Sequence, residues 1–192
     1  MQTGLPKTLT VNGREEKIRY EYTAVLDAIS ALNDPDLEDE EKVYACLFIL
    51  YENFENFEKD DYAPAFLAAS DFINNGTEDE NDRRRSPKLI DFEQDYKLLI
   101  PAVNKVAGME IREKTNIHWW TFLGWFMEIG EGTYSTVLTI RSKKSKGKKL
   151  EKWEQEFYNS NRKIVDIHER MSVSDKKRLE EAERKLNEIL NG

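Results

Sequence analysis

Three acidic residues and one histidine are the side chains of this sequence that could carry out acid–base or metal chemistry. Asp91, Glu93 and Asp95 lie at intervals of two within the segment DFEQD. In a helix, Asp91 and Asp95 share one face, four residues apart, while Glu93 points elsewhere, so the three make a poor ligand set. Acidic residues also gather where a helix begins, because the helix dipole is positive there. We favour this second interpretation.

His118 is the titratable group that stands inside the most aromatic stretch of the chain. Burial there lowers the pKa of a histidine, which suits a general base. No nucleophile accompanies it in the sequence, so we expect a buried or helix-capping histidine instead. Cys46 falls on an apolar helix face and is expected to be a small buried side chain. We expect no catalytic, cofactor-binding or metal-binding residue, and no cofactor.

Composition excludes several classes of protein. The 192 residues carry 29 Lys and Arg against 37 Asp and Glu, a net charge of −8, which disfavours a general nucleic-acid binder. One cysteine and two histidines exclude an internal disulfide and a Cys/His metal site. No apolar run approaches a membrane span, and the first residues are not a signal peptide. The basic segment 141–149 lacks the interleaved aromatic residues that stack on bases. We therefore expect no nucleic-acid partner, and the absence of a long apolar run predicts no membrane contact.

Hydrophobic periodicity predicts a mainly α-helical protein with a short N-terminal β-hairpin. Residues 8–11 and 17–20 alternate around the turn Asn12-Gly13, a strong hairpin signal. Helical periodicity follows. One predicted helix begins at Asp91, whose side chain can cap it, and ends at Gly108, which can adopt the left-handed conformation. We predict a helical body over residues 1–141 with a mobile loop at about 77–88, and a basic linker with charged helices over 142–192.

Two apolar surfaces have more than one interpretation. Trp119 and Phe122 lie on the main stripe of the aromatic helix and are predicted core residues. Trp120 and Trp125 fall off that stripe, so they complete a second packing layer or anchor a protein interface. The last helix carries a narrow apolar stripe, which indicates a docking seam for this chain, another copy or a different partner. Its candidate interface residues are Leu179, Leu186 and Ile189.

The middle of the chain, roughly residues 20–163, resembles the tail assembly chaperone-type proteins of siphophages and prophages of Gram-positive bacteria, which are encoded next to the tape measure protein. The resemblance depends on the paired motifs Asp91-Phe92-Glu93-Gln94-Asp95 and Ile117-His118-Trp119-Trp120-Thr121-Phe122. At this separation the pair is fairly specific, whereas either motif alone would be weak.

The resemblance implies a non-enzymatic helical protein that binds and solubilises the tape measure protein and assists tail-tube polymerisation in the cytoplasm of the bacterial host. It also implies a homo-oligomer, with the major tail protein as a further candidate partner. A bare tape measure is a long, partly apolar rod, and many weakly bound acidic copies could shield it. The alternatives are a structural minor tail or virion component and, more remotely, a small metal-dependent hydrolase using Asp91, Asp95 and His118.

Overall fold

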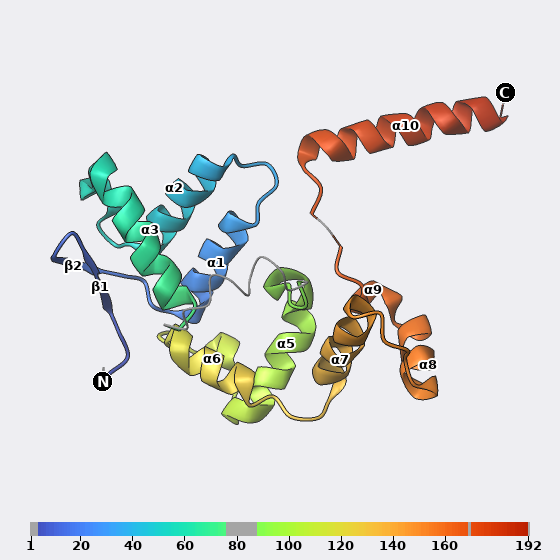
Figure 1. Cartoon of the computed structure of the whole chain (residues 1–192), viewed down its shortest axis with the longest axis horizontal. Coiled ribbons are helices and arrows are strands. Elements are labelled where there is room, and N and C mark those ends of the chain that lie inside the picture. The colour runs from blue at the N-terminus through green and yellow to red at the C-terminus, as the bar shows by residue number, and fades with distance from the viewer. Residues whose placement is uncertain (1–3, 76–87, 169, 192) are drawn as a thin grey trace.

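The computed structural model describes residues 4–75, 88–168 and 170–191, without the side chains of residue 183 and residues 185–191. The predicted mobile loop at 77–88 therefore lies outside the described residues, apart from Lys88. The described chain is mostly helical, with one two-stranded antiparallel hairpin near the N-terminus (Figure 1). The predicted fold class is confirmed.

The hairpin pairs β1 (Thr8–Val11) with β2 (Arg14–Lys17) across a two-residue turn. Asn12 and Gly13 both have positive φ, 49° and 78°, as a tight hairpin turn requires. The sequence placed the second strand at 17–20, which is too late. The turn sets Arg14 opposite Val11, so β2 begins at Arg14, and Ile18 instead bridges to Tyr51 at the end of a helix.

The helical body consists of elements joined mostly by short connections. The first three α-helices and the hairpin form one end of the molecule, at the left of Figure 1. The next two helices lie beside them and complete the body. The elements in chain order are α1 (Tyr22–Leu32), α2 (Asp39–Leu50), the 3₁₀ turn η1 (Phe54–Asn56), α3 (Lys59–Ile73), α5 (Phe92–Ala107), the 3₁₀ turn η2 (Ile111–Glu113) and α6 (Trp119–Met127).

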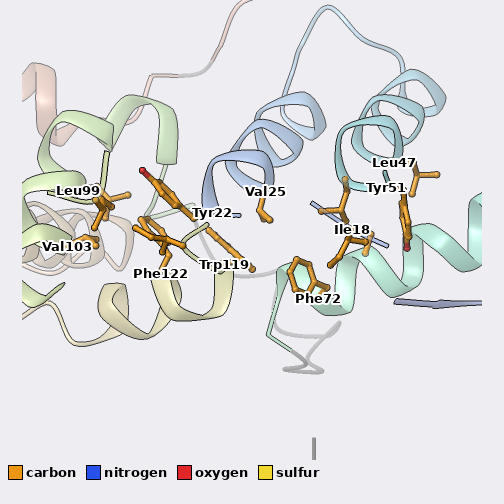
Figure 2. Close-up of a cluster of buried hydrophobic side chains, with 14 of the residues drawn as sticks. Ile18, Tyr22, Val25, Leu47, Tyr51, Phe72, Leu99, Val103, Trp119 and Phe122 are labelled. Atoms are coloured by element: carbon orange, nitrogen blue, oxygen red, sulfur yellow. The ribbon is translucent and has the colours of Figure 1, made fainter. Parts of the chain in front are cut away.

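One continuous apolar core joins the hairpin to these helices. Figure 2 shows side chains from every part of the body meeting in it, including Ile18 after the hairpin, Val25 of α1 and Phe72 of α3. Burying such side chains is the main force that stabilises a domain of this kind. The hairpin is too small to be stable alone and is held by this core, as Val11 is fully buried.

The C-terminal part begins with α7 (Thr133–Ser145), followed by α8 (Lys152–Ser160) and α9 (Arg162–Val165). A second, small core of Val137, Ile140 and Val165 joins α7 to α9. The sequence predicted a basic linker from residue 142, but α7 continues through Ser145. Finally, α10 (Val173–Asn191) extends away from the body (Figure 1). The proposed division into domains stays a prediction.

Candidate functional site

The segment DFEQD forms the start of α5, and its first residue caps that helix. The Asp91 carboxylate accepts hydrogen bonds from the backbone N–H groups of Glu93 and Gln94, at 3.1 and 3.0 Å. Lys88 lies 2.8 Å from its second oxygen. Burial alone would raise the pKa of Asp91, but the hydrogen bonds from Gln94 and Lys88 outweigh it and lower the pKa. The prediction of a helix cap is confirmed, as is Gly108, left-handed at φ 69°, at the other end.

Asp95 belongs to a buried ion pair that the sequence analysis missed. Its two carboxylate oxygens each lie 2.7 Å from a terminal nitrogen of Arg141 on α7, and both side chains are almost fully buried. The guanidinium also donates to three backbone carbonyls, those of Leu89, Ile164 and Val165. All five guanidinium N–H groups therefore have an acceptor, the condition under which a buried arginine is tolerated.

The sequence groups Arg141 with the basic segment 141–149, because it opens the run RSKKSKGKK. One signal in the sequence could have separated it from the lysines that follow. It stands four residues after Val137 and next to Ile140, so in a continued helix it shares their buried face. An arginine on a buried face needs an acidic partner, and Asp95 of α5 is that partner.

Glu93 and Gln94 hold the segment between α9 and α10, residues 166–168 and 170–172, which we name the strap. The Gln94 side chain bonds to the Asp166 carbonyl at 2.8 Å and accepts from the His168 N–H at 3.0 Å. Arg170 reaches Glu93 at 2.6 Å. The strap thus crosses the start of α5 before the chain enters α10.

His118 caps α6 rather than pointing into a reactive cleft. Its Nδ1 accepts a hydrogen bond from the Trp120 backbone N–H at 3.0 Å, while Nε2 lies 2.8 Å from the Pro6 carbonyl. Because a carbonyl only accepts, this geometry assigns the proton to Nε2. The ring stacks on Tyr20, and burial lowers the pKa of His118. A neutral imidazole is therefore the form that fits both bonds.

The two adjacent tryptophans close the C-terminal end of α3. The indole N–H of Trp119 donates to the Ile73 carbonyl at 2.8 Å, and that of Trp120 donates to the Phe72 carbonyl at 2.9 Å. Carbonyls in the last turn of a helix lack the usual partner four residues on, so these bonds act as a side-chain cap. The Phe72 carbonyl also accepts from the Asn75 backbone N–H at 3.1 Å. Trp120 and Trp125 are each partly buried against the main core. The sequence analysis also predicts that both tryptophans lie off the main apolar stripe of α6.

Phe92 and Phe122 complete the aromatic packing around Trp119. The Phe122 ring is fully buried and stacks between Trp119 and Tyr22, with centroid distances of 5.5 and 4.9 Å. Phe92 meets Trp119 edge-on, at a centroid distance of 6.0 Å. The two motifs of the sequence therefore contact one another directly in the core.

The remote possibility of a metal-dependent site finds no support in this arrangement. Within the described ranges, no group of three His, Cys, Asp or Glu side chains is placed to hold a metal ion. Asp91 and Asp95 are bonded to cations and backbone N–H groups, whereas His118 is engaged with Pro6 and Trp120. Cys46 is fully buried on α2, and burial raises the pKa of its thiol to about 11.

One feature that could bind a partner is an open groove of about 830 Å³ between α1 and α5. Its apolar lining consists of Leu26 and Ile29 of α1, Phe92 and Tyr96 of α5, and Ile90 just before α5. Charged and polar side chains of both signs surround them, including Asp27, Lys88, Glu93, Lys97 and Arg170. An apolar surface with a polar border is typical of sites that bind an amphipathic helix.

A second exposed apolar surface lies at the C-terminal end. Val173 and Leu179 are about half exposed, at 52% and 48%. The other two candidate interface residues, Leu186 and Ile189, belong to α10 but their side chains lie outside the described ones. None of the helices in the described ranges is both long and apolar enough to cross a membrane.

Comparison with protein families gives one match, and it covers most of the chain. The model of the family described as "Bacteriophage Gp15 protein" matches residues 1–167, which include both motifs, the Asp95–Arg141 pair and all of the groove lining except Arg170. Helix α10 lies beyond the matched residues. The searches of curated proteins and of solved structures returned no match. The chain belongs to the bacteriophage Gp15 protein family.

Proposed function

We propose that this bacteriophage protein is a non-enzymatic tail assembly chaperone that binds the tape measure protein, keeps it soluble and assists tail-tube polymerisation. The observation that carries the proposal is the groove between α1 and α5. Its apolar lining includes Phe92 of the DFEQD motif and lies within the residues that match the phage family.

A helical client fits the chemistry of this groove. One turn of an amphipathic helix can place its apolar side chains against Leu26, Ile29 and Phe92 while its polar face stays in water. The border carries both charge signs, so it can pair with the mixed charges of a long helical rod. Such a contact buries only a small area, which keeps each one weak. Weak contacts repeated along a rod give firm coating that arriving tube subunits can still displace.

The net charge of −8 supports the same role. A coat of acidic copies gives a poorly soluble rod a uniform negative charge, and like-charged particles resist aggregation. The tape measure protein therefore becomes more soluble because the acidic surface of the bound copies covers it.

The test is co-expression with the long helical protein encoded beside this chain. Thr23 is exposed on α1 and lines the groove, so Thr23→Trp fills the groove without disturbing the core. The control is Thr139→Trp, an exposed helical threonine on α7 away from the groove. The wild type and the control should keep the client in the soluble fraction, and Thr23→Trp should lose it. An equally soluble client with Thr23→Trp, or an insoluble client with the wild type, refutes the proposal.

The alternative of a structural tail component differs in one measurable respect. A chaperone is displaced during assembly, so mass spectrometry of purified particles should find it absent or scarce. Stoichiometric presence in the finished particle favours the structural role instead.

A further inference from the structure

Two exposed patches of opposite charge lie at opposite ends of the molecule, and each has an aromatic side chain at its centre. The first, which we name the acidic patch, lies on α2 and η1. The second, the basic patch, lies at the end of α7 and the start of α8. Figure 1 shows α2 and α8 on opposite sides of the body, so the two patches of one molecule do not meet.

The acidic patch contains two unusually exposed aromatic rings. Tyr44 and Phe48 lie one turn apart on α2 and are 50% and 59% exposed. Both rings meet the buried ring of Phe54 edge-on, at centroid distances of 5.0 and 6.2 Å, so they are held in fixed positions. Rigid exposed aromatic side chains are the residues that most often anchor protein interfaces.

Acidic side chains surround these rings. Residues 34–41 contain six acids and residues 52–58 contain three, while Lys42 is the one basic residue from 34 to 58. Glu40 and Glu41 lie one turn before Tyr44, and Glu52 lies four residues after Phe48; all three are exposed. Arg19 is nearby, but its guanidinium is engaged with carbonyls at the end of α2. The patch therefore presents net negative charge around an apolar centre.

The basic patch has the complementary composition. Residues 146–152 contain four lysines and one glutamate, and the lysines are exposed. Gly147, left-handed at φ 63°, ends α7 and turns the chain toward α8. Trp153, the second residue of α8, is 57% exposed. Within the described part of the chain, Lys146, Lys148, Lys149 and Lys152 form no ion pair, whereas Lys143 and Lys144 are bonded to Glu154 and Asp166.

We infer that the acidic patch of one copy binds the basic patch of a second copy, with Trp153 packed against Tyr44 and Phe48. The two surfaces match in charge and in their aromatic centres, and one chain provides both. Because the two patches differ, the contact is head-to-tail, and each added copy leaves one patch of each kind free. Repetition builds a ring or a filament of copies. Both patches lie within the residues that match the phage family.

Charge complementarity of this kind makes association sensitive to salt. Sedimentation velocity over a range of protein concentrations should show association at low salt that weakens as salt is added. A wild type that stays monomeric at every concentration refutes the inference.

Two charge-reversed variants test the direction of the contact. Glu52→Lys with Glu55→Lys halves the net negative charge of the acidic patch, and Lys148→Glu with Lys149→Glu reverses the charge of the basic patch; all four side chains are exposed. Each variant alone should lose self-association by roughly tenfold or more. Mixed together, the two still possess one intact acidic and one intact basic patch. They should form a 1:1 complex and nothing larger.

The matched control for the acidic-patch variant is Glu113→Lys with Glu128→Lys, which makes the same change in net charge outside both patches and should associate like the wild type. Unchanged association of either patch variant, or no complex on mixing, overturns the inference. A short DNA duplex provides a further arm. If the wild type binds it, the basic-patch variant does not, and neither self-associates, the basic patch binds nucleic acid instead. These experiments use this chain alone, so they are independent of the tape measure proposal.

Discussion

Replacing Asp95 by asparagine tests whether the buried ion pair holds the C-terminal helices to the body. The amide keeps the shape of the carboxylate but removes its charge, so the Arg141 guanidinium stays buried beside a neutral group. Breaking a buried pair by removing one partner costs about 3–5 kcal/mol. For a chain of this length, the loss corresponds to a fall in melting temperature of roughly 6–20 °C.

The assay is urea unfolding followed by circular dichroism, with the free energy of unfolding taken from the midpoint and slope. A double-mutant cycle separates the pair from its surroundings. Asp95→Leu, Arg141→Met and the combination of both should show a coupling energy of about 2 kcal/mol or more. The combination should be more stable than either single variant, although it leaves three carbonyls without the guanidinium, at about 1 kcal/mol each.

Asp39→Asn is the control, because the Asp39 carboxylate is fully exposed beside Lys42 and should leave the midpoint nearly unchanged. The reasoning fails if Asp95→Asn unfolds at the same midpoint as the wild type. It also fails if the effects of the two single apolar variants simply add.

Three further predictions concern the motifs and the titratable groups. Trp120→Phe removes the indole N–H from the Phe72 carbonyl and should lower the free energy of unfolding by about 1–2 kcal/mol in the same urea assay. Cys46, fully buried with a thiol pKa of about 11, should react slowly with Ellman's reagent at pH 8 and rapidly in urea. The pKa values of Asp61 and Asp91 are lowered in the folded protein, by hydrogen bonds that favour the charged carboxylate. The folded state therefore binds fewer protons than the unfolded chain, so unfolding midpoints should fall as the pH drops below their ordinary value of 3.8.

Each of these predictions has its own control or contrary result. Trp153→Phe changes an exposed tryptophan and should leave stability nearly unaltered, so an equal loss there contradicts the capping role of Trp120. Native protein that reacts with Ellman's reagent as fast as a free thiol contradicts the burial of Cys46. For the acid prediction, Asp61→Asn with Asp91→Asn should flatten the dependence of the midpoint on pH, and an unchanged slope contradicts it.

Local signals in the sequence predicted the elements and most of their ends. Asn12-Gly13 tolerates the positive φ angles that a two-residue hairpin requires, and Asp91 and Gly108 have the side chains that begin and end a helix. Each of these signals acts within a few residues, so the local sequence alone determines where the turn or the helix end lies. The second strand was misplaced because its alternation continues past Lys17. Pairing with the other strand stops there, since the turn fixes the register.

Partners distant in the sequence were the features that local reasoning missed. Arg141 and Asp95 are 46 residues apart, and nothing near Arg141 distinguishes it from the lysines beside it except its position on the apolar stripe. Trp120 lies off that stripe, yet its indole caps a helix 48 residues earlier. Neither contact follows from periodicity, because periodicity gives the face of a helix and not the identity of what covers it.

The size of the small C-terminal core has a consequence for how the chain unfolds. Three buried side chains, Val137, Ile140 and Val165, are too few to keep α8 and α9 folded by themselves. The attachment of α7 and α9 to the body depends on the Arg141 guanidinium, which bonds to α5, to the segment before it and to α9. Lys143 joins α8 to α7 through an ion pair with Glu154. Heating should therefore melt α7 to α9 together with the body in one cooperative transition. Because α9 stays folded only while α5 is folded, amide protons in α9 should exchange with solvent no more slowly than those in α5.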